Sequence, residues 1–214
     1  MEDRLLERLK EDIAGDLRPV RPLRPFWRRV LPVAGLWLLL ALAVLSVFGL
    51  RADHEALGPL GTWLVPALQG LAVAALAVYL YRSIFPGSLP PQGALTGAIL
   101  AALVTHIFAV AWTEHLHFNS PADHPLRAGL VCFSFVLLLG LPLLGGFVWL
   151  VRAGLFARPI RIGLLAGLAG GLAAEAAWRL HCPYTNWQHI VFSHTLGALV
   201  ITALGVLYFR LRRP

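Results

Sequence analysis

Six long apolar stretches separated by short polar turns limit how this chain can fold. They lie at about 30–50, 60–81, 92–113, 127–151, 161–181 and 190–209, and each is near the roughly 20 residues that a helix needs to cross a bilayer. The chain is 58% hydrophobic and only 14% charged, which excludes an ordinary soluble domain. We therefore expect an all-α fold: a polytopic membrane protein whose residues 30–214 form a six-transmembrane-helix bundle in the lipid bilayer.

Basic residues are distributed very unevenly between the two sides of this expected bundle. If the N-terminus is inside, every Lys and Arg falls on the inner face except Arg51, Arg127 and Arg179. Such a bias is the positive-inside signal of membrane proteins. It predicts cytoplasmic N- and C-termini for a multi-pass membrane protein. The net charge of +7 then reflects membrane orientation, so we expect no direct contact with nucleic acid.

The polar segment 1–29 precedes the first apolar stretch and forms a region of its own. Its apolar side chains recur every four residues, which predicts a short amphipathic helix. Such a helix can bind a groove on a partner protein or lie on the inner leaflet. The residues that would make this contact are Leu5, Leu6, Leu9, Ile13 and Leu17.

The chain has two cysteines, Cys132 at the start of the fourth stretch and Cys182 at the end of the fifth. Both lie on the outer side. Counted from Phe156 in the turn between the stretches, they are 24 and 26 residues away. At about 1.5 Å per residue, their heights differ by roughly 3 Å. The pair could be a disulfide, a metal site or a redox switch, or simply two small buried side chains.

Seven of the eight histidines share that outer side, and His181, His189 and His194 are closest in sequence to the cysteines. Thiolate and imidazole ligands suit zinc, copper(I) or cadmium. The spacing matches no zinc finger or ribbon. The alternative is that these histidines only lie at the membrane interface. No cofactor other than such a soft metal ion is indicated.

The fifth stretch combines an ionisable residue with a row of glycines. Glu175 is costly inside a membrane and needs a partner, and Arg179 lies four residues on, on the same helix face. This pair is either a structural ion pair or a polar link from the outer edge to the bundle interior. Gly163, Gly167 and Gly171 permit close helix contact, within the bundle or between copies in a homo-oligomer.

The sequence contains no nucleophile elbow, phosphate loop or zinc-protease motif, so we do not expect an enzyme. The apolar stretches also lack the paired carboxylates typical of a proton-driven transporter. A thiol–disulfide oxidoreductase is disfavoured because the cysteines do not form a Cys-x-x-Cys motif. A small membrane protein that binds or transports metal, with the outer Cys/His residues as its site, remains an alternative.

Several of these features occur together in one family. The tail contains Leu5-Leu6-x-x-Leu9 and then Pro19-Val20-Arg21-Pro22-Leu23, and the segment from Leu180 to Pro183 reads Leu-His-Cys-Pro. Cys132 opens the fourth stretch, and the chain ends in an arginine cluster. In these respects the chain resembles the NrsF family, negative regulators of sigma-F, which are membrane anti-sigma factors of extracytoplasmic-function sigma factors.

The resemblance implies a regulatory function. The cytoplasmic tail would hold an extracytoplasmic-function sigma factor at the bacterial inner membrane. A signal at Cys132 and Cys182, which in relatives is heavy-metal or oxidative stress, would release it and so change transcription.

Overall fold

The computed structural model of the protein describes residues 25–85, 92–115, 125–152, 154, 158–184 and 186–212, together with Glu7 and Lys10. These residues form helices and no strand, as predicted. The five tail residues expected to contact a partner lie outside the described part. The elements are α2 (Phe26–Phe48), α3 (His54–Arg82), α4 (Gln92–His115), α5 (Pro125–Val151), α6 (Pro159–Arg179), α7 (Trp187–His189), the π-helix η1 (Ile190–Thr195) and α8 (Leu196–Leu211).

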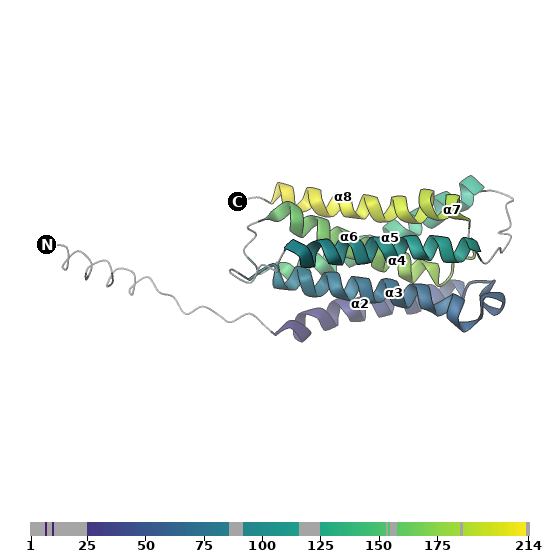
Figure 1. The fold of residues 1–214 in the computed structure, drawn as a ribbon, viewed down its shortest axis with the longest axis horizontal. Coiled ribbons are helices and arrows are strands. Elements are labelled where there is room, and N and C mark those ends of the chain that lie inside the picture. The colour runs from purple at the N-terminus through teal and green to yellow at the C-terminus, as the bar shows by residue number, and fades with distance from the viewer. Residues whose placement is uncertain are drawn as a thin grey trace.

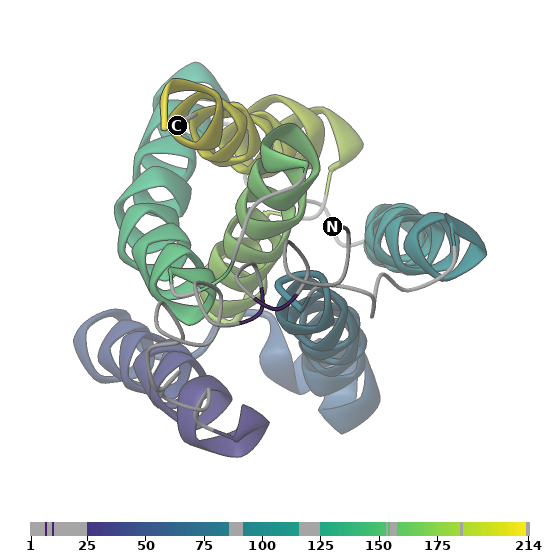
Figure 2. The same ribbon diagram turned by 90° about the vertical axis from the view of Figure 1, so that its left-hand side faces the viewer.

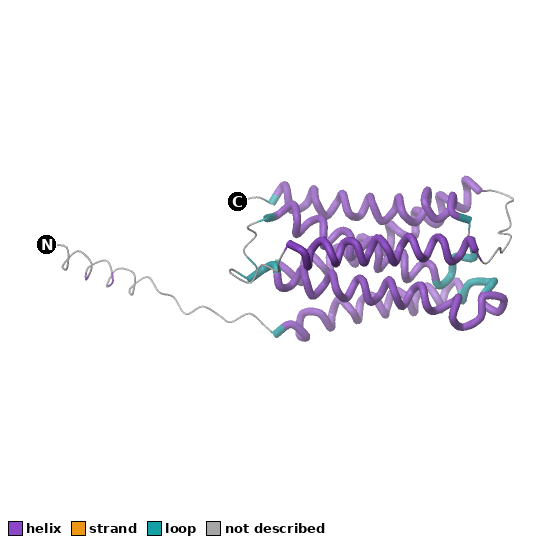
Figure 3. Tube along the Cα trace, in the orientation of Figure 1, coloured by secondary structure: helices purple, strands orange, loops and turns teal. Residues whose placement is uncertain are grey.

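The long helices lie side by side as a bundle (Figures 1 and 3). The chain enters α2 and leaves α8 at the same end, which we call the tail end. There the Arg29 guanidinium donates a hydrogen bond to the carbonyl oxygen of Leu150, so the start of α2 contacts the end of α5. The opposite end, which contains Cys132 and Cys182, is the cysteine end.

Proline and glycine mark several helix boundaries. Pro159 begins α6, where its missing N–H is not needed. Gly49 follows α2 with a φ of 79°, and Gly58 interrupts the first turn of α3 with a φ of 66°. Residues other than glycine rarely adopt these backbone angles. The chain can therefore reverse direction between α2 and α3 in a short connection.

Five helical segments in the described part of the chain are long and apolar enough to cross a membrane. They are Phe26–Phe48, Leu57–Arg82, Leu126–Val151, Pro159–Arg179 and Trp187–Leu211. The prediction of six spans is thus borne out for five. The expected span at 92–113 is helical within α4, but its described apolar segment, Ile99–Phe108, is shorter than a bilayer requires.

Large apolar side chains are exposed around the outside of the bundle. Leu39 on α2, Leu71 on α3 and Phe192 on η1 are each more than 60% exposed. A soluble protein rarely exposes so much contiguous apolar surface, whereas lipid covers it without cost. The surface and the five long helices together indicate a membrane protein.

The most buried helix is α6, which contacts α2, α3, α5 and α8 (Figure 2). Its predicted glycine row packs against α8 within the same chain. A Cβ on Gly163, Gly167 or Gly171 would stand 2.5 to 2.8 Å from a backbone atom of α8. The glycines therefore allow two backbones to touch inside the bundle. In contrast, α4 lies at the edge, mainly against α3.

Adding one methyl group to this contact should destabilise the bundle. A Cβ at Gly167 would lie 2.5 Å from the Cα of Thr202, and neither backbone can yield easily. We expect Gly167→Ala to lower the free energy of unfolding by about 1–3 kcal/mol, as overpacking does. The matched control is Gly35→Ala on α2, where a Cβ meets nothing within 4 Å. Denaturant unfolding of both variants, followed by circular dichroism, measures the difference; equal stabilities would contradict the close contact.

Candidate metal or thiol site

The two cysteines lie together at the cysteine end. Cys132 is in the third turn of α5 and Cys182 follows the end of α6, and their Sγ atoms are 3.6 Å apart. Both are free thiols, and both side chains are buried. A disulfide would bring the sulfurs to about 2.05 Å. The structure thus brings together the pair that counting along the two helices placed at one height.

Two histidines complete a compact group with the cysteines. The Nε2 atom of His189 is 3.5 Å from the Sγ of Cys182, and His194 lies beside His189, with ring centroids 5.4 Å apart. One ligand atom from each of the four residues lies within 4.8 Å of the others. All four residues are buried. We refer to Cys132, Cys182, His189 and His194 as the Cys2His2 cluster.

The π-helix η1 explains how both histidines reach the cluster. His189 and His194 are five residues apart, which in an α-helix would turn their side chains about 140° from each other. In the π-helical segment Ile190–Thr195 each N–H donates to the carbonyl oxygen five residues earlier, and the wider turn brings residues five apart closer to one face than an α-helix does. The wider turn therefore directs both rings to the same side, a local effect that sequence periodicity did not reveal.

His194 provides an independent sign that the cluster is suited to a ligand. Its side chain is 1% exposed, and neither ring nitrogen makes a hydrogen bond to any described residue. A buried polar group without a partner costs about 1–3 kcal/mol. Coordination of one nitrogen to a metal ion would remove part of this cost, and the donor set fits such an ion.

The donor spacing agrees with tetrahedral coordination. Zn–S bonds of about 2.3 Å and Zn–N bonds of about 2.0 Å place tetrahedral ligand atoms about 3.3–3.8 Å apart. The separations of 3.6 Å between the two sulfurs and 3.5 Å between Cys182 and His189 fall in this range. Small side-chain movements would bring the remaining atoms, now within 4.8 Å, to the same distance.

Burial affects the pKa of Cys182, which lies after the end of α6 and outside the membrane-spanning helices. It raises the pKa of the Cys182 thiol well above its ordinary value, and the adjacent sulfur of Cys132 raises that pKa further. Cys182 therefore keeps its proton at neutral pH, and it loses that proton when the sulfur binds a metal ion or forms a disulfide.

His181, the third predicted co-ligand, is not part of the cluster. Its Nδ1 atom lies 3.2 Å from the carbonyl oxygen of Gly49, and its ring contacts those of Phe48 and Trp178. His181 and Cys182 are adjacent in sequence, yet their side chains have different partners. His181 instead joins the end of α2 to the end of α6.

The predicted pair Glu175 and Arg179 is the centre of a buried polar network. Arg179 donates from Nε and Nη2 to the Oε1 atom of Glu175, at 3.1 and 2.5 Å. The Oε2 atom accepts from the Gln69 amide at 2.5 Å and lies 2.9 Å from Nδ1 of His106. Three helices thus contribute partners to one carboxylate: α3 through Gln69, α4 through His106 and α6 through Arg179. This arrangement satisfies a carboxylate that is fully buried.

The network reaches the Cys2His2 cluster through one side chain. Nε2 of His106 lies 2.7 Å from the hydroxyl of Thr195, and Thr195 follows His194 in the chain. His106 therefore connects α4, the carboxylate of Glu175 and the end of η1. Neither His106 nor Gln69 was predicted as a site residue. Their positions as rare polar residues inside apolar helices were the signal that could have identified them.

Comparison with known proteins identifies the family of this chain. A family model described as "Negative regulator of sigma F" matches residues 13–212, nearly the whole chain. The chain belongs to the NrsF family. It is 28% identical to the anti-sigma-F factor NrsF of Caulobacter vibrioides, over 95% of this chain and 94% of that relative. It is also 29% identical to the carotenogenesis protein CarR of Myxococcus xanthus, over 98% and 88% of the two chains.

No solved structure matches the chain. Membership in the NrsF family confirms the predicted resemblance. It identifies a regulatory anti-sigma factor family, which implies a sigma factor as partner and a role other than catalysis.

The Cys2His2 cluster of this NrsF family member should bind a divalent thiophilic ion. We expect the purified full-length chain to bind one Co²⁺ with tetrahedral d–d bands and a thiolate-to-cobalt charge-transfer band. Cys182→Ser should remove most of the charge-transfer intensity. His194→Gln should weaken binding by more than about tenfold, since even residues that only support ligands cost that much. Absorption titration measures both effects.

His181→Gln is the matched control for that titration, because His181 is adjacent to Cys182 in sequence but outside the cluster. Its affinity for Co²⁺ should equal that of the unaltered chain. Octahedral spectra in every variant, or equal losses for His181→Gln and His194→Gln, would contradict the cluster.

The buried carboxylate should be essential for stability. Glu175→Ala leaves Arg179 buried without its partner and should lower the free energy of unfolding by about 3–5 kcal/mol. Replacing both residues by leucine removes both charges, so this double variant should be more stable than Glu175→Ala. Denaturant unfolding in detergent checks both expectations. A Glu175→Ala chain as stable as the unaltered one would show that the ion pair is not buried.

Proposed function

We propose that this protein is a membrane-bound anti-sigma factor that holds an extracytoplasmic-function sigma factor through residues 1–29. It releases the sigma factor when a thiophilic metal or an oxidant acts at Cys132 and Cys182. The observation that carries this proposal is the buried Cys2His2 cluster in a chain of the NrsF family. The cluster is the site where a metal or an oxidant would act, and membership in the family supports the regulation of a sigma factor as the result.

The proposed membrane arrangement includes α4 as a sixth span. A sixth crossing returns the C-terminus to the side of the N-terminus, in agreement with the common tail end of α2 and α8 (Figure 1). Arg28, Arg29, Arg82, Arg152 and Arg210 all lie at or near helix ends on that side. A basic tail end supports a cytoplasmic location for it in the bacterial inner membrane. The cysteine end then faces the periplasm.

Charge balance favours a divalent ion such as zinc or cadmium over copper(I). Two thiolates and a divalent ion are neutral together, and Glu175 and Arg179 already neutralise each other. Copper(I) would leave a net negative charge in a buried site, where an uncompensated charge is costly. The proposed cofactor is therefore a soft divalent ion that acts as a signal.

Oxidation is the second input consistent with the sulfur geometry. Two thiols 3.6 Å apart can form a disulfide while a hydroperoxide accepts their two electrons and two protons and is reduced to water and an alcohol. The sulfurs would then approach each other by about 1.5 Å. A disulfide draws α5 and the segment after α6 together, whereas a metal ion would also draw in α7 and η1, which contain His189 and His194.

Thr195 offers a route from the cluster to the rest of the bundle. A change in η1 that moves His194 also moves Thr195, whose hydroxyl contacts His106 on α4. His106 in turn contacts Glu175, the centre of the buried network. We propose that metal or disulfide formation reorganises this contact and so alters the position of the helices that lead to the tail.

Sigma-factor retention tests the proposal directly. The intact chain, purified from its host membrane, should retain a sigma factor, and a chain lacking residues 1–29 should lose it. Cadmium should release the sigma factor from the intact chain but not from Cys132→Ser, because that variant lacks one thiolate ligand. Mass spectrometry of the retained proteins and expression of the target genes under cadmium measure the two effects.

His181→Gln is again the control, and it should release the sigma factor normally. An intact chain that retains no sigma factor would refute the anti-sigma proposal. If that chain still bound cadmium and moved it across vesicle membranes, the protein would instead be a small metal-transport protein. Normal release from Cys132→Ser would remove the cysteines from the sensing role.

A further inference from the structure

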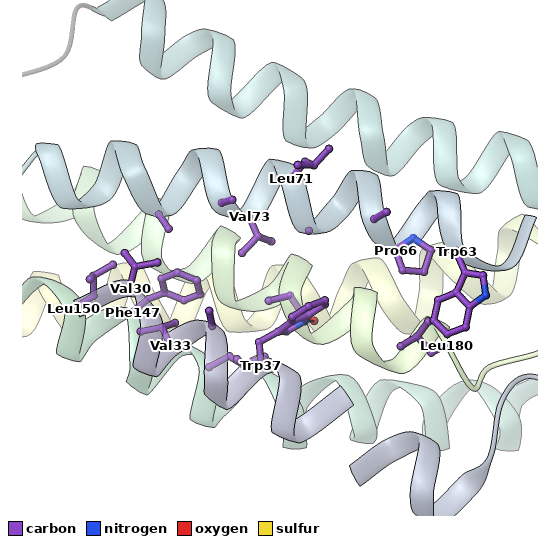
Figure 4. Close-up of a pocket in the computed structure, with 17 residues that line it drawn as sticks. Val30, Val33, Trp37, Trp63, Pro66, Leu71, Val73, Phe147, Leu150 and Leu180 are labelled. Atoms are coloured by element: carbon purple, nitrogen blue, oxygen red, sulfur yellow. Dashed lines mark hydrogen bonds between the residues drawn. The ribbon is translucent and has the colours of Figure 1, made fainter. Parts of the chain in front are cut away.

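A second feature of the bundle, separate from the Cys2His2 cluster, is an apolar cavity of about 640 Å³ between α2 and α3 (Figure 4). Val30 and Trp37 of α2 form one wall, Trp63 and Gly70 of α3 form the other, and Phe147 and Leu180 of α5 and the turn after α6 form the floor. Its volume is that of a typical small-molecule site. None of the residues that line it has a charged side chain.

The cavity exists because α2 and α3 pack on other helices. α2 contacts α5 and α6, while α3 contacts α6 and α4, and direct contact between α2 and α3 is minor. The face of α3 toward the cavity consists of small residues at helical spacing, namely Ala67, Gly70, Ala74 and Ala77. Such a face usually permits a helix to approach closely. Here α2 stays at a distance, so a long apolar space remains between them.

The shape of this space suits a single flexible chain. Along α3 it extends from Trp63 to Ala77, about 21 Å at the helical rise. The indole N–H of Trp37 donates to the carbonyl oxygen of Ala173 at 2.8 Å. Its polar atom is thus satisfied by α6, and the ring presents carbon to the cavity.

Positive charge lies at the tail end of the cavity. The Arg29 side chain donates to the carbonyl oxygen of Leu150, one of the lining residues, and is half-buried there. Arg28 is exposed next to it and lies over the ring of Trp27. Arginine and interfacial tryptophan together are typical of the level of lipid headgroups. The cavity is apolar along its length and has two arginines at its tail end. It therefore suits a ligand with an apolar chain and an anionic group at one end of that chain.

We propose that the cavity binds one acyl chain of an anionic phospholipid, with the headgroup at Arg28 and Arg29. The chain lies between α2 and α3 and fills the space that the small residues of α3 leave. It thereby joins two helices that otherwise have little contact. Leu180, at the far end of the cavity, is two residues before Cys182, so the lipid also supports the segment that positions this cysteine.

A space-filling substitution tests the acyl-chain site. A Cβ on Gly70 meets nothing within 4 Å, so Gly70→Leu should fold while its side chain occupies the cavity. The matched control is Gly145→Leu on α5. A Cβ there also meets nothing within 4 Å, but Gly145 does not line the cavity. The full chain in detergent is titrated with brominated phosphatidylglycerol, and tryptophan fluorescence is recorded. Trp37 and Trp63 line the cavity and should be quenched.

We expect quenching of the unaltered chain and of Gly145→Leu to saturate at one lipid per chain, and Gly70→Leu to lose at least half of the quenching. Equal quenching in all three would overturn the proposal. Native mass spectrometry of the unaltered chain is a measurement independent of any variant. It should detect one retained phospholipid, and retention of none, or of a non-lipid molecule instead, would also overturn it.

The headgroup is tested by comparing brominated phosphatidylglycerol with brominated phosphatidylcholine. Arg29→Gln should reduce the preference for the anionic lipid about fivefold, the effect of one basic residue near a membrane surface. Arg212→Gln, which removes an arginine of the tail end on α8, is the control and should keep the preference. An unchanged preference in Arg29→Gln would refute the assignment of the headgroup to this end.

Discussion

The close backbone contact between α6 and α8 is the constraint on which the rest of the structure depends. Gly163, Gly167 and Gly171 allow the two helices to touch, and a Cβ at any of these positions would clash with the backbone of α8. The contact places the C-terminal half of α6, with Glu175, next to η1 at the start of the last span. The buried carboxylate and the Cys2His2 cluster therefore lie close together because two helix backbones do.

Burial of charge explains the second level of organisation. A carboxylate inside an apolar bundle must be compensated, and Glu175 obtains contacts from Arg179, Gln69 and His106. These contacts join α3 and α4 to α6, although the apolar surfaces of α4 contribute little packing. The same low-polarity surroundings favour a neutral set of two thiolates and a divalent ion in the cluster. The cost of burying an uncompensated charge thus explains both the partners of Glu175 and the preference of the Cys2His2 cluster for a divalent ion.

Much of the site was predictable wherever helix geometry is regular. The heights of Cys132 and Cys182 follow from the constant rise of two consecutive helices, and the Glu175–Arg179 pair follows from four-residue spacing. The structure separates His181 from the cluster, because the direction of a side chain in a turn depends on local backbone angles. Prediction also missed His106 and Gln69, whose partner is 69 and 106 residues away in sequence. Such long-range contacts leave no periodic signal.

The sequence by itself determined the helical fold and the membrane character, because the length of the apolar stretches and the charge bias are local properties. Glycine spacing, also a local property, identified α6 as the helix with close contacts. The sequence also contained the motifs of the NrsF family. Only the tertiary structure decided which residues meet. The π-helix directs His189 and His194 to the cysteines, and the separation of α2 from α3 creates the apolar cavity. The first is a local widening of the backbone that leaves no periodic signal, and the second depends on how α2 and α3 pack on other helices.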